Sequence, residues 1–244
     1  MVDVTRARSF ESIGEEYDRY RPGFPERAAD IIVPDRVATA LDLGAGTGKF
    51  TGLLVARATQ VIAVEPSAPM LAVLARTLPT VDARPGTAES IPVPDGSVDA
   101  VSVAQAFHWF DRDAAAAEIA RTLVPHGTLG LLWNRADPAC AWDLACHRVA
   151  HPAVGADDDT SASATDLPGF VLEVHEEVRW IERITREDYL RRWGTVSSFL
   201  VADEAQRTAM VAALEAVLDG TDETRGKAEF DLPHLTDVFR YRRA

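Results

Sequence analysis

The strongest constraint on the fold lies between residues 37 and 134, where short apolar runs alternate with segments of helical periodicity. Apolar or β-branched runs predict strands at 37–43, 60–65, 97–104 and 127–134, with a weaker one at 81–86. Segments with apolar residues at i, i+3, i+4 and i+7 predict helices at 47–58, 68–78 and 112–123. Strands that alternate with helices pair in parallel through right-handed crossovers, so a parallel sheet covered on both faces is expected.

The pattern changes after residue 134. Helices are expected at 137–152, 185–200 and 203–220, and strands at 170–182 and 227–243, the last interrupted at Pro233. The simplest organisation is a single domain over 1–244. Its expected parts are lead-in helices at 9–33, a core at 37–134, cap helices at 137–152 and 185–220, and closing strands at 170–182 and 227–243.

Composition excludes several classes of partner. The 244 residues carry a formal net charge of −13, whereas proteins held by nucleic-acid phosphates concentrate Lys and Arg, so no nucleic-acid partner is expected. No apolar run of about 18 residues occurs and the first ten residues lack the apolar segment of a signal peptide, so no membrane partner and a cytoplasmic location are expected. No set of His, Asp or Glu has metal-ligand spacing, so no metal is expected.

The stretch LDLGAGTGKFTGLL (41–54) places Gly44, Gly46 and Gly48 in a turn between the first strand and the next helix. A phosphate-binding P-loop requires Gly-x-x-x-x-Gly-Lys-Ser/Thr, and it fails because Leu43 and Phe50 occupy its first and last positions. A dinucleotide-binding turn requires Gly-x-Gly-x-x-Gly, and here a lysine occupies the third glycine position. Neither pattern describes this turn.

An acidic residue ends each of the first two predicted strands. Asp42 precedes the glycines, and Glu65 follows 23 residues later, where a carboxylate can accept both hydroxyls of a ribose. Together with this turn, GTAESIPVPDGSVDAVSVAQAFHWF (86–110) and IARTLVPHGTLGLLWN (119–134) resemble the class I S-adenosylmethionine-dependent methyltransferases. EEYDRYRPGFPERAADII (15–32) resembles the lead-in of a small-molecule subgroup, the type 11 or trans-aconitate-methyltransferase-like enzymes.

The resemblance implies a fold and a cofactor. The fold is an α/β, doubly wound Rossmann-like sheet in the order 3-2-1-4-5-7-6, mostly parallel with an antiparallel C-terminal strand, and with a helical cap. The single domain becomes a methyltransferase domain whose core, 37–134, binds S-adenosylmethionine and leaves S-adenosylhomocysteine as product.

Carried over position by position, the resemblance implies a set of cofactor-binding residues: Asp42, Gly44, Ala45, Gly46, Gly48, Glu65, Pro66, Met70, Ala88, Glu89, Gln105, Tyr17 and Arg21. Glu65 is expected at the ribose and Gln105 at the methionyl end. Three roles stay open. Asp42 either bonds the cofactor's amino group or braces the glycine loop, Glu89 either lies at the adenine edge or is a surface acid, and Arg21 either approaches the cofactor carboxylate or is a surface residue.

His108, just past the fourth strand in AFHWF, is the candidate catalytic residue. It either serves a neutral hydroxyl or amine acceptor as general base or only positions the acceptor, and a carboxylate acceptor needs no base. Trp109 and the cap residues Trp142, Trp193 and Phe199 are candidates for the wall that contacts the acceptor, although the three cap residues fit a core role equally well.

These observations predict an S-adenosylmethionine-dependent methyltransferase (EC 2.1.1) that acts by direct displacement on a small-molecule acceptor, at an oxygen or a carboxylate. The alternative is a protein of the same fold with a role other than methyl transfer, as a scaffold or a rearrangement catalyst, because fold alone does not fix function. Nucleic-acid methylation is disfavoured by the charge, and a monomer or a homodimer is expected.

Overall fold

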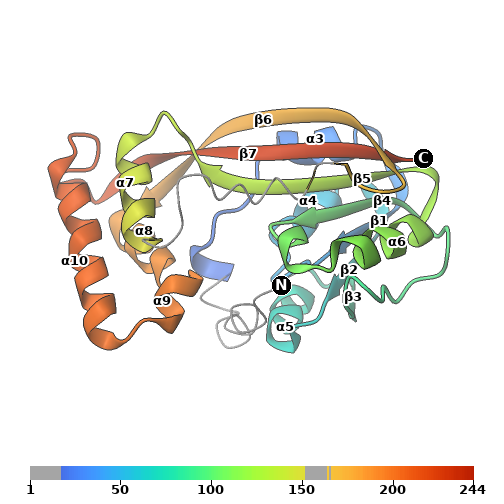
Figure 1. Ribbon diagram of the computed structural model, residues 1–244, viewed down its shortest axis with the longest axis horizontal. Coiled ribbons are helices and arrows are strands. Elements are labelled where there is room, and N and C mark those ends of the chain that lie inside the picture. The colour runs from blue at the N-terminus through green and yellow to red at the C-terminus, as the bar shows by residue number, and fades with distance from the viewer. Residues whose placement is uncertain (1–17, 152–163, 165) are drawn as a thin grey trace.

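The protein folds around one seven-stranded sheet, with helices on both of its faces and a further group of helices at one end (Figure 1). The computed structural model describes residues 18–151, 164 and 166–244. The strands are β1 Val37–Leu43, β2 Ala58–Glu65, β3 Asp82–Pro85, β4 Val98–Ala104, β5 Leu123–Ala136, β6 Phe170–Thr185 and β7 Glu229–Arg243. The helices are α3 Glu26–Ile32, α4 Thr51–Leu54, α5 Ala68–Thr77, α6 Arg112–Thr122, α7 Ala141–Ala150, α8 Arg186–Trp193, α9 Ser197–Val201 and α10 Glu204–Gly220, with a 3₁₀ turn at Phe107–Trp109.

The strand order is β3-β2-β1-β4-β5-β7-β6. Strands β1 to β5 pair in parallel, whereas β7 runs antiparallel to both β5 and β6. The predicted doubly wound sheet with an antiparallel C-terminal strand is therefore confirmed. The direction of winding reverses between β1 and β4, and open α/β sheets bind ligands at the carboxyl ends of the strands at such a point.

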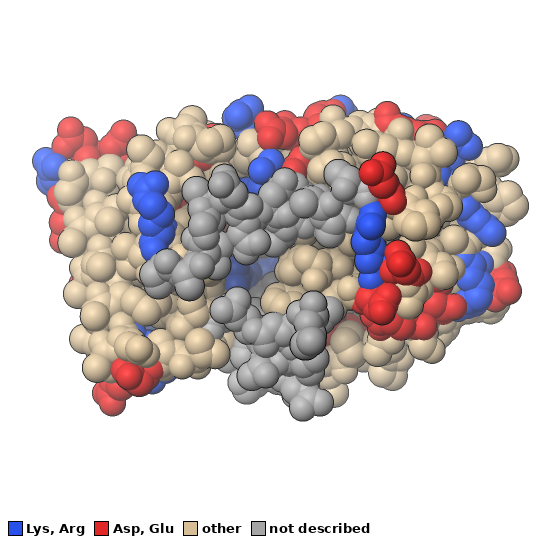
Figure 2. Space-filling model, in the orientation of Figure 1, with Lys and Arg blue, Asp and Glu red and all other residues tan. Residues whose placement is uncertain are grey.

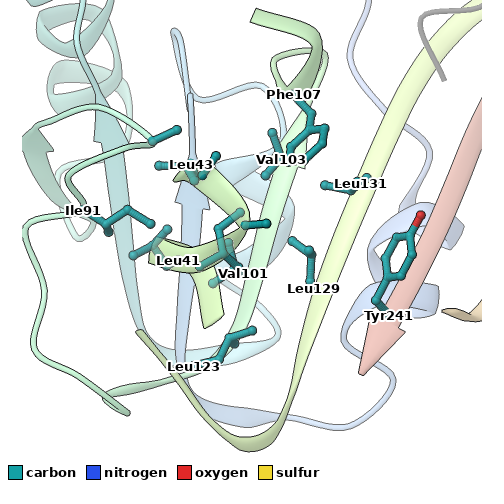
Figure 3. Packing of buried hydrophobic residues seen from close by; sticks show 14 of the residues in the cluster. Leu41, Leu43, Ile91, Val101, Val103, Phe107, Leu123, Leu129, Leu131 and Tyr241 are labelled. Carbon is teal, nitrogen blue, oxygen red and sulfur yellow. The ribbon is translucent and has the colours of Figure 1, made fainter. Parts of the chain in front are cut away.

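Successive residues of the central strands enter opposite cores, because side chains alternate along a strand. Leu41 and Val101 enter one core (Figure 3). Ile119 of α6 belongs to the same core. Ala40 enters the other, where Ile32 of α3 packs against the sheet. Since both faces are covered, the short apolar runs that predict the strands are explained by burial on both sides.

The helical cap has a core of its own. Beyond the parallel strands, β6 and β7 continue as a two-stranded ribbon that carries helices α7 to α10 (Figure 1). Tyr189, Leu214 and Phe230 are buried there, in a cluster separate from the two that cover the central sheet.

The helix predicted at 47–58 is far shorter in the structure. Gly44, Gly46 and Gly48 all adopt positive φ angles, which keep the chain out of the helical region throughout the turn. Helix α4 then contains only Thr51–Leu54, and β2 already begins at Ala58.

Two further predicted boundaries are wrong. The helix predicted at 185–200 is divided at Gly194 into α8 and α9. The interruption predicted at Pro233 does not occur, because β7 runs through it. Pro233 pairs with Ile181 of β6, while the pairing with β5 begins only at His234, so at Pro233 strand β7 has a partner on one side only, where a sheet tolerates proline.

Acidic and basic side chains are interspersed on the face drawn in Figure 2, without a large basic patch among the residues described there. In the described ranges, no helix has the length and apolar character needed to cross a membrane.

Candidate functional site

A pocket of about 410 Å³ opens at the carboxyl ends of β1, β2, β4 and β5, where the winding of the sheet reverses. Its volume falls within the range of small-molecule sites. It is lined by Arg21, Pro22, Phe24, Gly44, Ala45, Gly46, Thr47, Lys49, Phe50, Glu65, Pro66, Ser67, Met70, Ala104, Gln105, Ala106, His108, Trp109, Phe110 and Asn134. Of the residues expected to bind a ligand, ten lie here: Arg21, Gly44, Ala45, Gly46, Glu65, Pro66, Met70, Gln105, His108 and Trp109.

The glycine turn forms the floor of the pocket. Gly44 has φ +68°, and a Cβ added there would lie 2.7 Å from the Cβ of Ala106 and 3.1 Å from the ring of Phe110. The Gly44 N–H donates to the carbonyl of Val64, 2.9 Å away, which ties the turn to the end of β2. Only glycine combines this backbone conformation with so close an approach of the 106–110 segment.

Glu65 is held by the backbone on both sides of the pocket. Its Oε2 accepts from the Gly46 N–H at 2.9 Å, and its Oε1 accepts from the Ser67 N–H at 2.8 Å. Burial raises the pKa of this carboxyl, and the two backbone hydrogen bonds oppose that rise. The side chain is therefore oriented before any ligand arrives, and each oxygen keeps a lone pair for another donor.

Asp42 lies beneath the turn and does not line the pocket. Its two oxygens accept from the hydroxyls of Thr51 and Ser102, at 2.6 and 2.7 Å. Complete burial raises the pKa of Asp42 to about 6, against the effect of these hydrogen bonds. Of the two roles left open for this residue, the geometry favours bracing of the glycine loop, because both oxygens are already engaged with α4 and β4.

Gln105 begins the wall opposite Glu65. It follows β4 with φ +56°, a left-handed conformation that is uncommon outside glycine and marks a constrained site. Its Nε2 donates to the carbonyl of Asn134 at the end of β5, 3.0 Å away. The side-chain nitrogen of Asn134 in turn donates to the carbonyl of Gly23 at 2.8 Å. The ends of two strands and the lead-in segment are thereby joined at one side of the pocket.

His108 and Trp109 lie in the 3₁₀ turn after β4. The buried indole N–H of Trp133 donates to Nδ1 of His108 at 3.2 Å. An indole nitrogen can only donate, so Nδ1 acts as acceptor and the proton of the neutral imidazole lies on Nε2. The ring of Trp109 lies beside that of His108, with centroids 4.7 Å apart.

Three other described residues expected at the cofactor do not line this pocket. Gly48 packs the turn against α5, where an added Cβ would lie 3.0 Å from Leu74. Ala88 is buried in the core under α6, and Glu89 accepts from the backbone N–H of Asp111 at 3.0 Å. Tyr17 lies outside the described residues.

The three cap residues expected to contact an acceptor are buried in the cap. Trp142 packs its ring edge to face against Tyr189, with centroids 5.5 Å apart, and Trp193 and Phe199 belong to the same cluster. None of the three lines the pocket. Of the two roles that fitted them, the structure places them in the core role.

Several pocket residues had no sequence signal of their own. Phe24 lies in the lead-in segment and packs edge to face on Phe50, with ring centroids 5.4 Å apart. Lys49, which the sequence places in an ordinary helix, lines the pocket 3.9 Å from Asp18. Asn134 could have been found, because it stands at the carboxyl end of a parallel strand beside β4.

The charged residues in the pocket lining are Arg21, Lys49 and Glu65. The acid stands at the end of β2, whereas the two cations come from the lead-in segment and the glycine turn. No cluster of three or more His, Cys, Asp or Glu side chains that could hold a metal occurs in the described part of the chain.

Comparison with known proteins gives three relevant similarities. Residues 41–131 match the family described as methyltransferase domain. An uncharacterized methyltransferase of Mycobacterium tuberculosis is 37% identical over 233 residues, which cover 95% of this chain and 94% of that protein. A solved structure described as a type II methyltransferase, from Anaeromyxobacter dehalogenans, has a TM-score of 0.69 at 25% identity, covering 92% of this chain and 98% of that one.

A further solved structure shows a likeness of fold. Geranyl diphosphate C-methyltransferase of Streptomyces coelicolor, in complex with Mg²⁺, geranyl diphosphate and S-adenosyl-L-homocysteine, has a TM-score of 0.56 at 14% identity. The alignment covers 99% of this chain and 97% of that one.

Proposed function

The chain belongs to the class I S-adenosylmethionine-dependent methyltransferases, and we propose that it transfers a methyl group by direct displacement to an oxygen of a small-molecule acceptor, carboxylate oxygens included. The observation that carries this proposal is the oriented Glu65 carboxylate beside the glycine turn, in a pocket at the switch point of the sheet.

The residues present fit S-adenosylmethionine. Each oxygen of Glu65 accepts one backbone N–H and retains capacity for one more donor, which matches the two hydroxyls of a ribose. Met70 and Pro66 line the pocket next to Glu65 and offer apolar contacts to an adenine. Gly46, with φ +57° and only the sulfur of Met70 within 4 Å of a built Cβ, leaves room for a ligand to lie against the backbone.

S-adenosylmethionine supplies a methyl group on a positively charged sulfonium, and transfer forms a carbon–oxygen bond as the carbon–sulfur bond breaks, leaving a neutral thioether. Because the donor is already activated, the protein has to align the acceptor and exclude water. Phe24, Trp109 and Phe110 supply apolar surface around the pocket for that purpose.

His108 positions the acceptor instead of removing its proton. Its Nδ1 is engaged by Trp133, so the neutral ring offers an Nε2–H, which donates a hydrogen bond and cannot accept a proton. A donor of this kind suits an acceptor oxygen that is already deprotonated, such as that of a carboxylate, because no proton then has to be removed. Lys49 and Arg21 add positive charge to the same lining, which favours an anionic acceptor.

Methyl transfer can be tested with tritium-labelled methyl groups. The protein is incubated with S-adenosylmethionine labelled in this way and with a small-molecule extract, and the products are separated by size. We expect label in the small-molecule fraction, and for a methyl ester we expect alkali to release it as volatile methanol. Glu65→Ala, which removes the ribose contacts, should transfer much less label.

Two results would contradict the proposal. Label in nucleic acid or protein would overturn the acceptor class. If the protein binds S-adenosylhomocysteine yet labels nothing in any fraction, its role is one other than methyl transfer.

A further inference from the structure

The segment Tyr20–Phe24 crosses the pocket between the central sheet and the helical cap, and it is called the strap below. Arg21, Pro22 and Phe24 of the strap line the pocket, so its position shapes the space available to a ligand. Among the strap residues, the backbone carbonyls of Tyr20 and Gly23 accept hydrogen bonds from side chains of distant elements. The strap is thus held at two places, one on each side of the pocket.

The cap holds one end of the strap. Arg192, a buried residue of α8, donates from Nε to the Tyr20 carbonyl at 3.0 Å, and its Nη2 pairs with Glu182 of β6 at 2.5 Å. Arg21 donates from Nη2 to the carbonyl of Thr195 at 3.1 Å. These contacts attach the first two strap residues to the helices of the cap.

The sheet holds the other end through a directional chain of hydrogen bonds. The indole N–H of Trp180 on β6 donates to the hydroxyl of Thr236 on β7, at 2.8 Å. That hydroxyl donates to Oδ1 of Asn134 on β5, at 2.6 Å, and Nδ2 of Asn134 donates to the Gly23 carbonyl, at 2.8 Å. The chain crosses three neighbouring strands and ends on the strap.

The direction of this chain follows from its first member. The Trp180 indole can only donate, so the oxygen of Thr236 accepts there and its single proton is directed to Asn134. The Asn134 amide then has its oxygen toward Thr236 and its NH₂ toward Gly23. In the reverse orientation the amide oxygen would face the Gly23 carbonyl, and two acceptors would oppose each other.

We infer that Thr236 and Trp180 are positioning residues for the cofactor. They contact no ligand themselves, and they act by fixing the Asn134 amide, which holds the strap over the pocket. Thr236 is fully buried and absent from the pocket lining, and Trp180 is half-buried on the edge strand, so neither could be identified from the pocket alone.

The hydrogen-bond chain from Trp180 to Gly23 affects the binding of one end of the ligand. Asn134 stands at the end of β5, beside Gln105 at the end of β4, whereas Glu65 stands at the end of β2, three strands away in the sheet. This inference rests on the proposed function, in which Glu65 binds the ribose. With the ribose at Glu65, the strap and Asn134 lie toward the homocysteine end of the ligand. Loosening the strap should therefore weaken contacts to that end and leave the nucleoside contacts intact.

The test compares two ligands on two variants by isothermal titration. Thr236→Val keeps the side-chain shape and removes the hydroxyl, and Thr236→Ser keeps the hydroxyl. We expect Thr236→Val to bind S-adenosylhomocysteine about tenfold more weakly, while 5′-methylthioadenosine, which lacks the amino-acid end, changes by less than about twofold. Thr236→Ser should restore both affinities to within about twofold of the wild-type protein.

Trp180→Phe provides a second variant, at the edge-strand end of the hydrogen-bond chain, in case Thr236→Val does not fold. It removes the indole N–H together with the five-membered ring and keeps an aromatic ring at this position, and we expect S-adenosylhomocysteine binding about threefold weaker. Hydrogen exchange gives a readout without ligand, because the amides of Tyr20, Arg21, Gly23 and Phe24 should exchange faster in both variants.

Three results would overturn the inference. Unchanged S-adenosylhomocysteine affinity in Thr236→Val would show that the chain does not position the strap, and an equal loss for both ligands would show a general structural effect. A folded wild-type protein that binds neither ligand would contradict the proposed function itself, and the inference with it.

Discussion

The hydrogen bond from the indole N–H of Trp133 to His108 determines the tautomer of the His108 ring. The acceptor, Nδ1, must carry a lone pair, so the tautomer of the neutral ring is set by a residue that is fully buried behind it. A proton on Nδ1 would oppose two N–H groups to each other. For this reason His108 is better suited to donate a hydrogen bond than to act as a general base.

The tautomer of His108 can be read from the nitrogen-15 chemical shifts of its imidazole. The wild-type protein should show the Nε2–H form at neutral pH, and Trp133→Phe, which removes the donor, should shift the ring toward a mixture of the two tautomers. His175, which is paired with Asp237, is the internal control and should not change. An Nδ1–H tautomer for His108 in the wild-type protein would contradict the assignment.

Asp42 makes stability depend on pH in a defined direction. Its folded-state pKa of about 6 lies above the ordinary value of 3.8, so burial of the charged form costs stability. This cost is absent below about pH 4, where the carboxyl is protonated in both states, and it develops fully as the pH rises through 6.

Asp42→Asn removes that charge. The free energy of unfolding of the variant minus that of the wild type should therefore rise between about pH 4 and 6, by on the order of 2 kcal/mol, and then level off. Denaturant unfolding at several pH values measures it, with the exposed Asp35→Asn as control. A difference that stays flat or falls over this range would show that Asp42 is not buried as a costly charge.

The sequence identifies pocket-lining residues that stand at strand ends and misses residues that are reached only through side-chain contacts. Glu65 and Gln105 each end a parallel strand, and the carboxyl ends of such strands are known to face the ligand. Asn134 occupies the same kind of position but follows an apolar run with no motif. The link from Thr236 to Asn134 joins residues 102 apart in sequence, which no local pattern can reveal.

At the scale of elements, Gly130 decides how closely α3 packs on β5. A Cβ added at Gly130 would lie 2.4 to 2.6 Å from three side-chain atoms of Ile32. Helix α3 directly precedes β1, so its position also bears on the lead-in segment.

Gly130→Ala should therefore lower the free energy of unfolding by about 1–3 kcal/mol, because the core has no room for the added methyl group. Ile32→Ala alone should cost about 2–5 kcal/mol, and the double variant should cost at least about 1 kcal/mol less than the sum. Gly220→Ala, with nothing within 4 Å of the added Cβ, is the matched control. Additive losses would mean that the two residues do not oppose each other.

The positions of the central strands were predictable from the sequence pattern and their order from the family resemblance, whereas several helix lengths were not predictable. Apolar runs mark β1, β2 and β4 clearly, because burial on both faces favours apolar side chains at most positions of these strands. The segment 47–58 has a helical pattern, but three glycines at positive φ hold most of it in a turn. Pro233 is tolerated in β7 because of the pairing on each side of the strand, which only the sheet topology reveals.

At the scale of the whole molecule, the strand ends of the sheet, the strap and the 106–110 turn together define the pocket. The aromatic residues Trp142, Trp193 and Phe199 fill the interior of the cap, so the aromatic surface that lines the pocket comes from the lead-in segment and the 106–110 turn instead. A sequence pattern cannot distinguish an aromatic residue of the core from one that lines a ligand pocket, since both positions require apolar surface. Their assignment depends on how helices α7 to α10 fold back on β6 and β7 (Figure 1).

Isothermal titration with S-adenosylhomocysteine measures whether this pocket holds S-adenosylmethionine through Glu65. The wild-type protein should bind one equivalent, and Glu65→Ala should bind about 100-fold more weakly, because two hydrogen bonds to a charged group are lost. Glu215→Ala removes the same charge from the exposed face of α10 and should bind like the wild type. No heat from the folded wild-type protein, or unchanged affinity in Glu65→Ala, would contradict the account.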